Sequence, residues 1–288
     1  MNFSLRASVG DGSRMENLKA VSFELRKDVI NMIYKAKTGH IGGDFSVMDI
    51  LVTLYYKHMN ISPETTSDPD RDKFILSKGH SVEAYYSVLA GRGFFPKADL
   101  ETYSQFKSKY IGHPNNKVNG IEMNSGSLGH GLSVSVGMAL AGKMDHKSYR
   151  VYTVMGDGEL AEGSVWEGAM AAGHYKLDNL TAVVDRNRLQ ISGTTEEVMS
   201  QDNQDDRWSS FGWNVIHAQG NNIDDLDKAF QIAKDTKGKP TVIIADTTKG
   251  YGVSFIENSA PWHHKIPNAQ EYEKALAELE QRRLAANE

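Results

Sequence analysis

The spacing of hydrophobic residues changes several times along this chain, and each change marks a predicted element. Between residues 14 and 37 apolar side chains recur every three or four positions, which predicts a long helix with Ser13 as its N-cap. After a glycine-rich turn, a second helix is predicted over residues 47–58, with Ser46 as its N-cap. Similar spacing predicts further helices over residues 82–89, 100–106, 131–143, 159–175, 223–237 and 269–285.

Short continuous apolar runs lie between these helical segments and predict buried strands. The runs are residues 73–76, 149–155, 180–184, 213–217 and 241–246. Strands that alternate with helices form a parallel sheet, because parallel neighbours need a crossover connection. The predicted fold class is therefore α/β, a parallel β-sheet flanked by helices on both faces. Residues 1–288 are expected to form a single domain that begins with a long helix and ends in a helical tail.

One βαβ unit, residues 151–187, carries polar groups where each of its strands ends. Asp157, between Gly156 and Gly158, follows the first strand, and Asn187 lies just after the second. The carboxyl ends of neighbouring parallel strands lie side by side, and ligands of open α/β sheets bind there. Carboxylate and amide oxygens suit a hard cation such as Mg²⁺ or Ca²⁺, which in turn binds phosphate. Gly158 lets the backbone approach closely, and the helix that follows favours an anion at its N-terminus.

A second glycine-rich segment, residues 124–131, precedes the helix predicted at 131–143. A glycine-rich loop at the start of a helix can bind phosphate groups or rings. These glycines are spaced Gly-x-x-Gly-x-Gly and follow no predicted strand, so the segment is not a dinucleotide-binding fingerprint. The sequence also contains no Walker lysine motif.

Composition narrows the class of protein without naming an activity. The 288 residues are 40% hydrophobic and 24% charged, which are ordinary values for a globular protein. A net charge of −5 argues against a general affinity for nucleic acid. The sequence has no apolar run long enough to span a membrane, and it has no cysteine, which excludes disulfides and thiol nucleophiles. A cytoplasmic location is the resulting expectation.

Six segments resemble, in order along the chain, the motifs of transketolases, which use thiamine diphosphate. Gly156-Asp157-Gly158, then 28 residues and Asn187, resembles the motif that holds metal and diphosphate, although the family often has two successive Asn where this chain has Arg186-Asn187. The resemblance implies the thiamine diphosphate-binding fold of the family's diphosphate-binding (PP) domain. The other resembling segments are Thr38-Gly39-His40, Leu76-Ser77-Lys78-Gly79-His80, Gly112-His113-Pro114, Ser125-Gly126-Ser127-Leu128-Gly129-His130-Gly131, and Lys249-Gly250-Tyr251-Gly252-Val253 with Trp262-His263.

This resemblance also implies which residues hold thiamine diphosphate and its Mg²⁺ or Ca²⁺. The metal ligands would be Asp157, Asn187 and the backbone carbonyl of Leu189. Glu162 would hydrogen-bond across a subunit interface to a cofactor-activating glutamate of the partner. The residues implied to contact the cofactor are His80 and Gly158 at the diphosphate, Gly126, Leu128 and Ile191 near the rings, and Glu162 and Asn187.

Three histidines, His40, His113 and His263, are implied to line the substrate channel. Ketol cleavage needs a base for a hydroxyl proton and an acid for a developing alkoxide, and imidazole can serve as both near neutral pH. His130 and His264 occupy positions where the family usually has other residues. We assign them no catalytic role, and a contribution to specificity stays open.

A complete transketolase chain also carries a domain that binds the aminopyrimidine ring and supplies the activating glutamate, and a third domain follows it. The resemblance is therefore to the N-terminal subunit of a split transketolase, and it implies a heterotetramer with a C-terminal subunit that carries the pyrimidine domain. The substrates would be sugar phosphates. The sequence does not identify the donor or the acceptor, because the arginines that bind the distal phosphate of the sugar lie largely in the other domains of relatives. A sulfonated sugar therefore stays as open as a pentose phosphate.

The leading hypothesis is thus transfer of a two-carbon ketol unit from a ketose to an aldose. The α subunit of a 2-oxo acid dehydrogenase shares the Gly-Asp-Gly motif and the split layout, but the set of histidine segments argues against it. A deoxyxylulose phosphate synthase is normally one long chain. A non-catalytic cofactor-binding homologue is the third alternative, and the joint presence of Asp157, Asn187 and the channel histidines argues against it.

Overall fold

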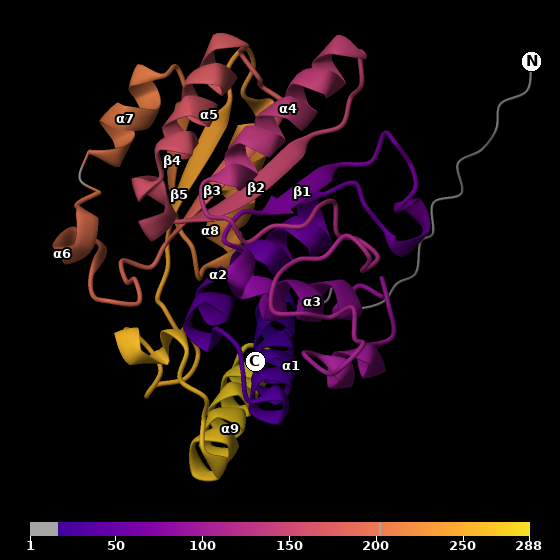
Figure 1. Cartoon of the computed structure of the whole chain (residues 1–288), viewed down its shortest axis with the longest axis vertical. Helices are drawn as coiled ribbons and strands as arrows, with labels where there is room; N and C mark the ends of the chain where they lie inside the picture. The colour runs from indigo at the N-terminus through magenta and orange to yellow at the C-terminus, as the bar shows by residue number, and fades with distance from the viewer. Residues whose placement is uncertain (1–16, 202) are drawn as a thin grey trace, which may run out of the picture.

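A five-stranded parallel sheet forms the centre of the chain in the computed structural model, which describes residues 17–201 and 203–288 (Figure 1). The order of strands across the sheet is β1-β2-β3-β5-β4, and every neighbouring pair runs parallel. The predicted α/β fold is therefore confirmed. The strands are β1 (Lys73–Leu76), β2 (Val151–Gly156), β3 (Leu180–Arg186), β4 (Asn214–Gln219) and β5 (Thr241–Asp246).

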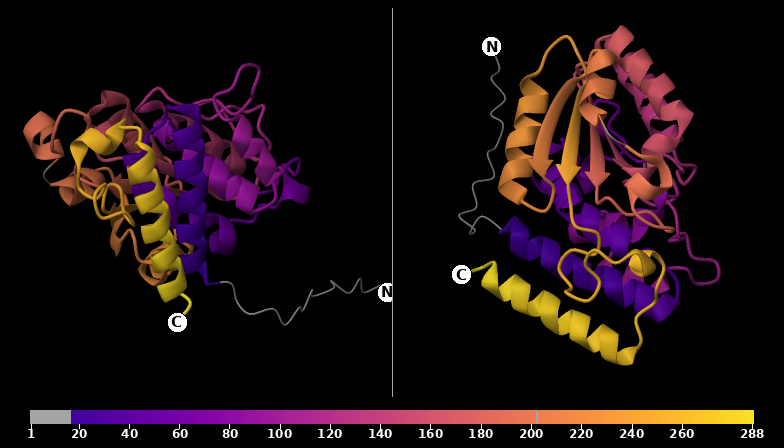
Figure 2. Two further views of the ribbon diagram at one scale, coloured as in Figure 1. Left: turned by 90° about the horizontal axis from the view of Figure 1, so that it is seen from below. Right: turned by 90° about the vertical axis from the view of Figure 1, so that its left-hand side faces the viewer.

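Helices pack on both faces of this sheet, as the right-hand view of Figure 2 shows. Successive strand residues point to opposite faces, so Tyr152 and Val154 join one hydrophobic cluster while Val151 and Met155 join the other. This two-sided burial explains why the strands are continuous apolar runs in the sequence. One face is covered by α4 (His130–Met144), α5 (Gly163–His174) and α7 (Gln204–Ser210), the other by α2 (Ile41–Thr53), α3 (Val82–Gly91) and α8 (Ile223–Asp235).

The first and last helices of the described chain, α1 (Leu18–Ala36) and α9 (Ala269–Ala285), lie side by side (Figure 2). The rings of Tyr34 and Tyr272 stack with centroids 4.1 Å apart, and the Tyr272 hydroxyl donates to Oδ1 of Asn31 at 2.7 Å. The side chain of Asn17 caps α1 by accepting from two backbone N–H groups. The cap predicted at Ser13 lies outside the described residues.

The N-cap predicted at Ser46 is wrong. Helix α2 begins at Ile41, and Ser46 is buried inside it with its hydroxyl 2.6 Å from Oδ2 of Asp185. Gly42 and Gly43, two of the glycines that suggested a turn, lie inside α2, where their bare backbone lets the helix pack closely. A Cβ on Gly43 would lie 2.8 Å from Oγ of Ser81, closer than real Cβ atoms come.

Short helical elements account for the other differences. The helix predicted over residues 159–175 is interrupted, with a 3₁₀ turn at Gly158–Ala161 before α5. The helix predicted over residues 100–106 is a 3₁₀ helix at Lys97–Thr102, and α6 (Thr195–Met199) and α7 were not predicted. Segments this short do not complete enough turns to show a helical period. Among the described helices, none combines the length and apolar character that a membrane crossing requires.

Candidate active site

A cleft of about 440 Å³ lies at the carboxyl ends of β2 and β3, where the sequence predicted the ligand site. The residues that line the cleft belong to segments that are far apart in the chain. Most of these segments contain the motifs described above. The described residues that line the cleft include His40, Lys78, His80, Gly126, Leu128, Asp157, Gly158, Glu162, Asn187, Leu189, Ile191, Lys249, His263 and His264.

One end of the cleft is acidic and is built by the strand register. Gly156 of β2 pairs with Asp185 of β3, so the two chain segments leave the sheet next to each other. The carboxylate of Asp157 is 3% exposed, accepts from the backbone N–H of Gly158 at 2.8 Å and accepts from that of Arg188 at 2.5 Å. Asp157 therefore fixes the loop after β3 against the loop after β2.

The predicted metal ligands offer oxygen atoms in this same corner. Oδ1 of Asn187 accepts from the backbone N–H of Leu189 at 3.2 Å, and the carbonyl oxygen of Leu189 accepts from Nζ of Lys249 at 2.9 Å. Burial raises the pKa of Asp157 to about 6, even though the nearby charge of Lys78 acts in the opposite direction. A bound cation would stabilise the ionised carboxylate further, and a carbonyl oxygen has a second lone pair for it. The donor set therefore fits a hard divalent cation.

A buried carboxylate that the sequence analysis did not single out, Glu159, organises the glycine-rich loops. Its oxygens accept from the backbone N–H of Gly129 at 2.8 Å, from that of Gly156 at 3.0 Å, and from the hydroxyl of Ser77. One side chain thus joins the ends of β1 and β2 to the loop before α4. The only sequence signal was a carboxylate directly after Gly158, where a solvent-exposed position was an equally reasonable interpretation.

The loop before α4 lies against the histidine segment at 112–114. Gly126 has φ +146°, and a Cβ there would lie 2.7 Å from Cδ2 of His113, so only glycine fits without strain. Leu128 lines the cleft, and Ile191 faces it from the opposite loop with 64% of its surface exposed. These apolar groups are available to a ring bound between them.

Three of the predicted histidines lie close together on the wall of the cleft. The ring centroids of His40, His80 and His263 lie 5.4 to 5.6 Å from one another. His113 is more peripheral: its centroid lies 6.2 Å from that of His40, and its side chain is exposed. His264 also enters the cleft, with its centroid 4.3 Å from that of His40.

Burial and neighbouring cations keep these imidazoles neutral. Burial, followed by the nearby charges of His264 and others, lowers the pKa of His40 to about 4. Burial and the ammonium of Lys249 lower the pKa of His263 to about 3. Burial also lowers the pKa of His80 well below its usual value and that of Lys249 to about 8. Neutral rings can accept protons at pH 7.

Lys249 also fixes which nitrogen of His263 carries the proton. Its Nζ lies 2.9 Å from Nδ1 of His263. Because an ammonium group can only donate, Nδ1 accepts and the proton of the neutral ring is on Nε2. Lys249 is 1% exposed, so this orientation is built into the interior.

Glu162 and His130 are both exposed to solvent. Glu162 is exposed on the rim of the cleft, between the 3₁₀ turn and α5. His130 is exposed at the first turn of α4, with Nδ1 3.3 Å from the carbonyl oxygen of Leu128, and it is not among the residues that line the cleft.

Comparison with known proteins identifies the family of this chain. A family described as "Transketolase, thiamine diphosphate binding domain" matches residues 18–279, so the chain belongs to that family and carries its thiamine diphosphate-binding fold. The resemblance drawn from the motifs is thereby confirmed, and the 2-oxo acid dehydrogenase interpretation is not supported.

Individual relatives are more specific. The chain is 49% identical to an apulose-4-phosphate transketolase subunit of Phocaeicola vulgatus, over 93% of this chain and 96% of the relative. It is 41% identical to a 6-deoxy-6-sulfo-D-fructose transketolase subunit of Clostridium sp. (strain MSTE9), over 88% and 94% respectively. The crystal structure of Campylobacter jejuni transketolase superposes with a TM-score of 0.82 at 28% identity, over 95% of this chain but 48% of that chain.

Proposed function

We propose that this chain is the diphosphate-binding subunit of a two-chain transketolase, which transfers a two-carbon ketol unit from a ketose phosphate to an aldose phosphate. The observation that carries the proposal is the joint arrangement of an oxygen-donor corner and three neutral imidazoles in one cleft. Similarity over nearly the full length of one subunit of a split transketolase supports it independently. Apulose 4-phosphate is the first donor to test, and a sulfonated fructose is the second.

The oxygen corner would hold the diphosphate end of the cofactor. Asp157, Asn187 and the Leu189 carbonyl would bind Mg²⁺ or Ca²⁺, and the metal would bind the diphosphate oxygens. His80, Lys78 and Lys249 flank this corner and offer hydrogen-bond donors and positive charge. Thiamine diphosphate, when bound, supplies the carbanion chemistry that breaks and forms the carbon–carbon bond.

The histidines would bind the sugar and move its protons. His263 presents Nε2–H because Lys249 donates to Nδ1, which suits a donor to a carbonyl or alkoxide oxygen. His40 is neutral at pH 7 and can accept a hydroxyl proton. His113 is exposed and lies next to Gly126, which lines the cleft, and it would contact a more distant hydroxyl of the sugar.

The partner would be a C-terminal subunit with the pyrimidine domain, in a heterotetramer of two copies of each chain. Glu162, which is exposed and lines the cleft, would hydrogen-bond to a glutamate of that subunit. We also infer that this chain forms a single domain, since both hydrophobic clusters share one sheet. The cytoplasmic location expected from the lack of cysteine stays a prediction.

The test is a donor screen with both subunits present. The chain would be mixed with the product of the neighbouring gene that encodes a pyrimidine domain, in thiamine diphosphate and Mg²⁺, and offered apulose 4-phosphate, 6-deoxy-6-sulfo-D-fructose or xylulose 5-phosphate with an aldose phosphate acceptor. Formation of a ketose two carbons longer than the acceptor supports the proposal. Cofactor binding without transfer from any donor would favour the non-catalytic alternative.

A further inference from the structure

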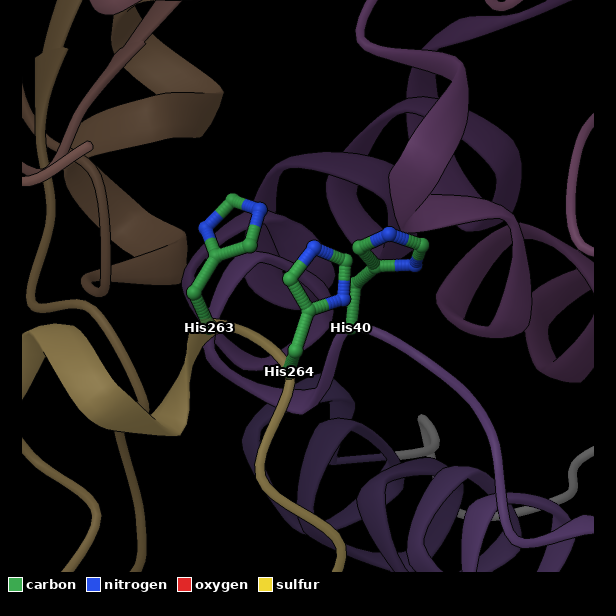
Figure 3. A group of neighbouring side chains, drawn as sticks. All are labelled: His40, His263 and His264. Carbon is green, nitrogen blue, oxygen red and sulfur yellow. The ribbon is translucent and has the colours of Figure 1, made fainter. Parts of the chain in front are cut away.

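His40, His263 and His264 form a compact cluster at the mouth of the cleft (Figure 3). Each offers a ring nitrogen, and these nitrogen atoms lie within 4.8 Å of one another. His264 lies between the other two, with its ring centroid 4.3 Å from that of His40 and 4.7 Å from that of His263. The transketolase chemistry proposed above uses His40 and His263 but gives His264 no task.

We propose that these three histidines form a binding site for a transition-metal dication, with Zn²⁺ as the expected ion, whose occupation blocks the substrate channel. Three imidazoles with an open fourth position are a ligand set that Zn²⁺ accepts, and water would complete the tetrahedron. The fourth position is available because His264 is exposed to solvent.

The donor chemistry separates this site from the oxygen corner around Asp157. Imidazole nitrogen favours Zn²⁺, Cu²⁺, Ni²⁺ and Co²⁺, whereas Mg²⁺ and Ca²⁺ favour oxygen ligands. One cleft would therefore contain two cation sites of opposite preference. A metal held by the cluster would occupy the nitrogens of His40 and His263 that the sugar needs.

The geometry requires a small adjustment that the structure permits. Zinc–nitrogen bonds of about 2.0–2.1 Å bring tetrahedral ligand atoms to about 3.4 Å from one another, so nitrogens that now lie within 4.8 Å must approach by up to about 1.4 Å. His264 follows the short 3₁₀ helix Ala260–His263, and its side chain is exposed, so few neighbours oppose a shift of its ring. Nδ1 of His40 is buried and has no hydrogen-bond partner among the described residues, so no hydrogen bond at that nitrogen holds the ring in place.

Lys249 opposes metal binding but does not prevent it. Its Nζ holds Nδ1 of His263, so the metal must bind at Nε2, which carries the proton in the free chain. On binding, Zn²⁺ replaces the Nε2 proton, which leaves to water, and Nδ1 takes a proton from Lys249, which becomes a neutral amine. The ligand is then a neutral imidazole, as metal binding requires.

The test uses Co²⁺, a spectroscopic probe for Zn²⁺ sites, with the full chain in excess Mg²⁺ and without cofactor or partner. We expect one equivalent of Co²⁺ to give the visible absorption of a four-coordinate site, and Zn²⁺ to displace it. His264→Asn should weaken binding at least about ten-fold, since loss of a group that only orients a metal ligand typically costs that much. His174→Asn, which changes an exposed histidine outside the cleft, should bind as the wild type does.

Three results would overturn the proposal. They are no four-coordinate spectrum, unchanged affinity in His264→Asn, or loss of binding in Asp157→Asn, which would place the metal at the oxygen corner. The Co²⁺ absorption does not require catalysis, so it tests the metal site independently of the proposed function. In an active two-chain enzyme, Zn²⁺ should inhibit competitively with the ketose donor, and His264→Asn should need at least about ten-fold more Zn²⁺ for the same inhibition.

Discussion

Lys78 and Asp185 form an ion pair beneath the cleft, with Nζ of the lysine 2.5 Å from Oδ2 of the aspartate. The two side chains are 2% and 0% exposed. Asp185 also accepts from the hydroxyl of Ser46 at 2.6 Å and from that of Thr247. The pair therefore ties the end of β1 to the end of β3, to helix α2 and to the loop after β5, all of which contribute residues to the cleft or lead directly into residues that line it.

Removal of this lysine should destabilise the fold. Lys78→Met is expected to lower the free energy of unfolding by about 3 kcal/mol, because it leaves the Asp185 charge buried without its partner. Urea denaturation measures the change. Lys117→Met, at an exposed loop lysine, is the control and should change the same quantity by less than about 0.5 kcal/mol. Equal stability of Lys78→Met and wild type would contradict a stabilising role for the pair.

Asp157 should be required for the metal but not for the fold. Asp157→Asn is expected to lose Mg²⁺-dependent affinity for thiamine diphosphate by at least about 100-fold, because it removes the one charged ligand of the oxygen corner. Quenching of tryptophan fluorescence by the cofactor, with Mg²⁺ and with EDTA, measures the affinity. Asp205→Asn changes a surface aspartate paired with His217 and should bind normally. Wild-type affinity in Asp157→Asn would remove Asp157 from the metal site.

His263 should matter for turnover and not for cofactor binding. His263→Asn is expected to lower kcat of the two-chain enzyme by about 100-fold or more, since general acid–base groups typically contribute roughly 10²–10⁴-fold. Its affinity for thiamine diphosphate should stay within a factor of about two, because an imidazole at the channel mouth does not hold the diphosphate. Steady-state kinetics at saturating cofactor separate the two effects. A variant with wild-type kcat would show that His263 moves no proton in the rate-limiting chemistry.

The neutral state of His40 predicts how stability depends on pH. Its pKa falls from 6.5 to about 4 on folding, so below pH 6.5 the unfolded chain binds a proton that the folded chain does not. Stability is therefore lost as the pH falls from 6.5 toward 4.

His40→Asn removes this dependence, and the comparison with wild type cancels groups such as Asp157 that titrate in the same range. Between about pH 6.5 and pH 5 the unfolding free energy of the wild type should fall by about 1.5 kcal/mol more than that of the variant. Denaturation curves at several pH values provide the measurement. Parallel pH profiles for the two chains would mean that His40 has an ordinary pKa in the fold.

The sequence predicted the parts of the site that follow from local pattern. Asp157 and Asn187 end adjacent strands, so the βαβ pattern alone placed them in one corner. The histidines were assembled by family resemblance, because no local rule brings residues 40, 80 and 263 together. Ser46 shows the limit of local reasoning: Gly42 and Gly43, which suggested a turn, lie inside α2 and let it approach Ser81 and its neighbours.

Contacts between side chains that are far apart in the sequence could not be predicted either, because no local pattern encodes them. Nothing near Lys249 in the sequence indicates that it holds both the Leu189 carbonyl and His263. Likewise, two of the three donors to Glu159, the Ser77 hydroxyl and the Gly129 N–H, come from segments that only the tertiary fold brings close to it. These contacts set the tautomer of His263 and the shape of the cleft. The motifs indicated where the site lies, and the structure adds how its side chains are oriented.

The proposal that this chain is the diphosphate-binding subunit of a split transketolase is best tested by reconstitution. Ketol transfer would be measured for the chain alone, for its partner alone and for the mixture, at equal concentrations with thiamine diphosphate and Mg²⁺. We predict that only the mixture transfers the ketol unit, while the isolated chain is inactive. Transfer by this chain without a partner, or no transfer by a mixture shown to form a complex with bound cofactor, would contradict the proposal.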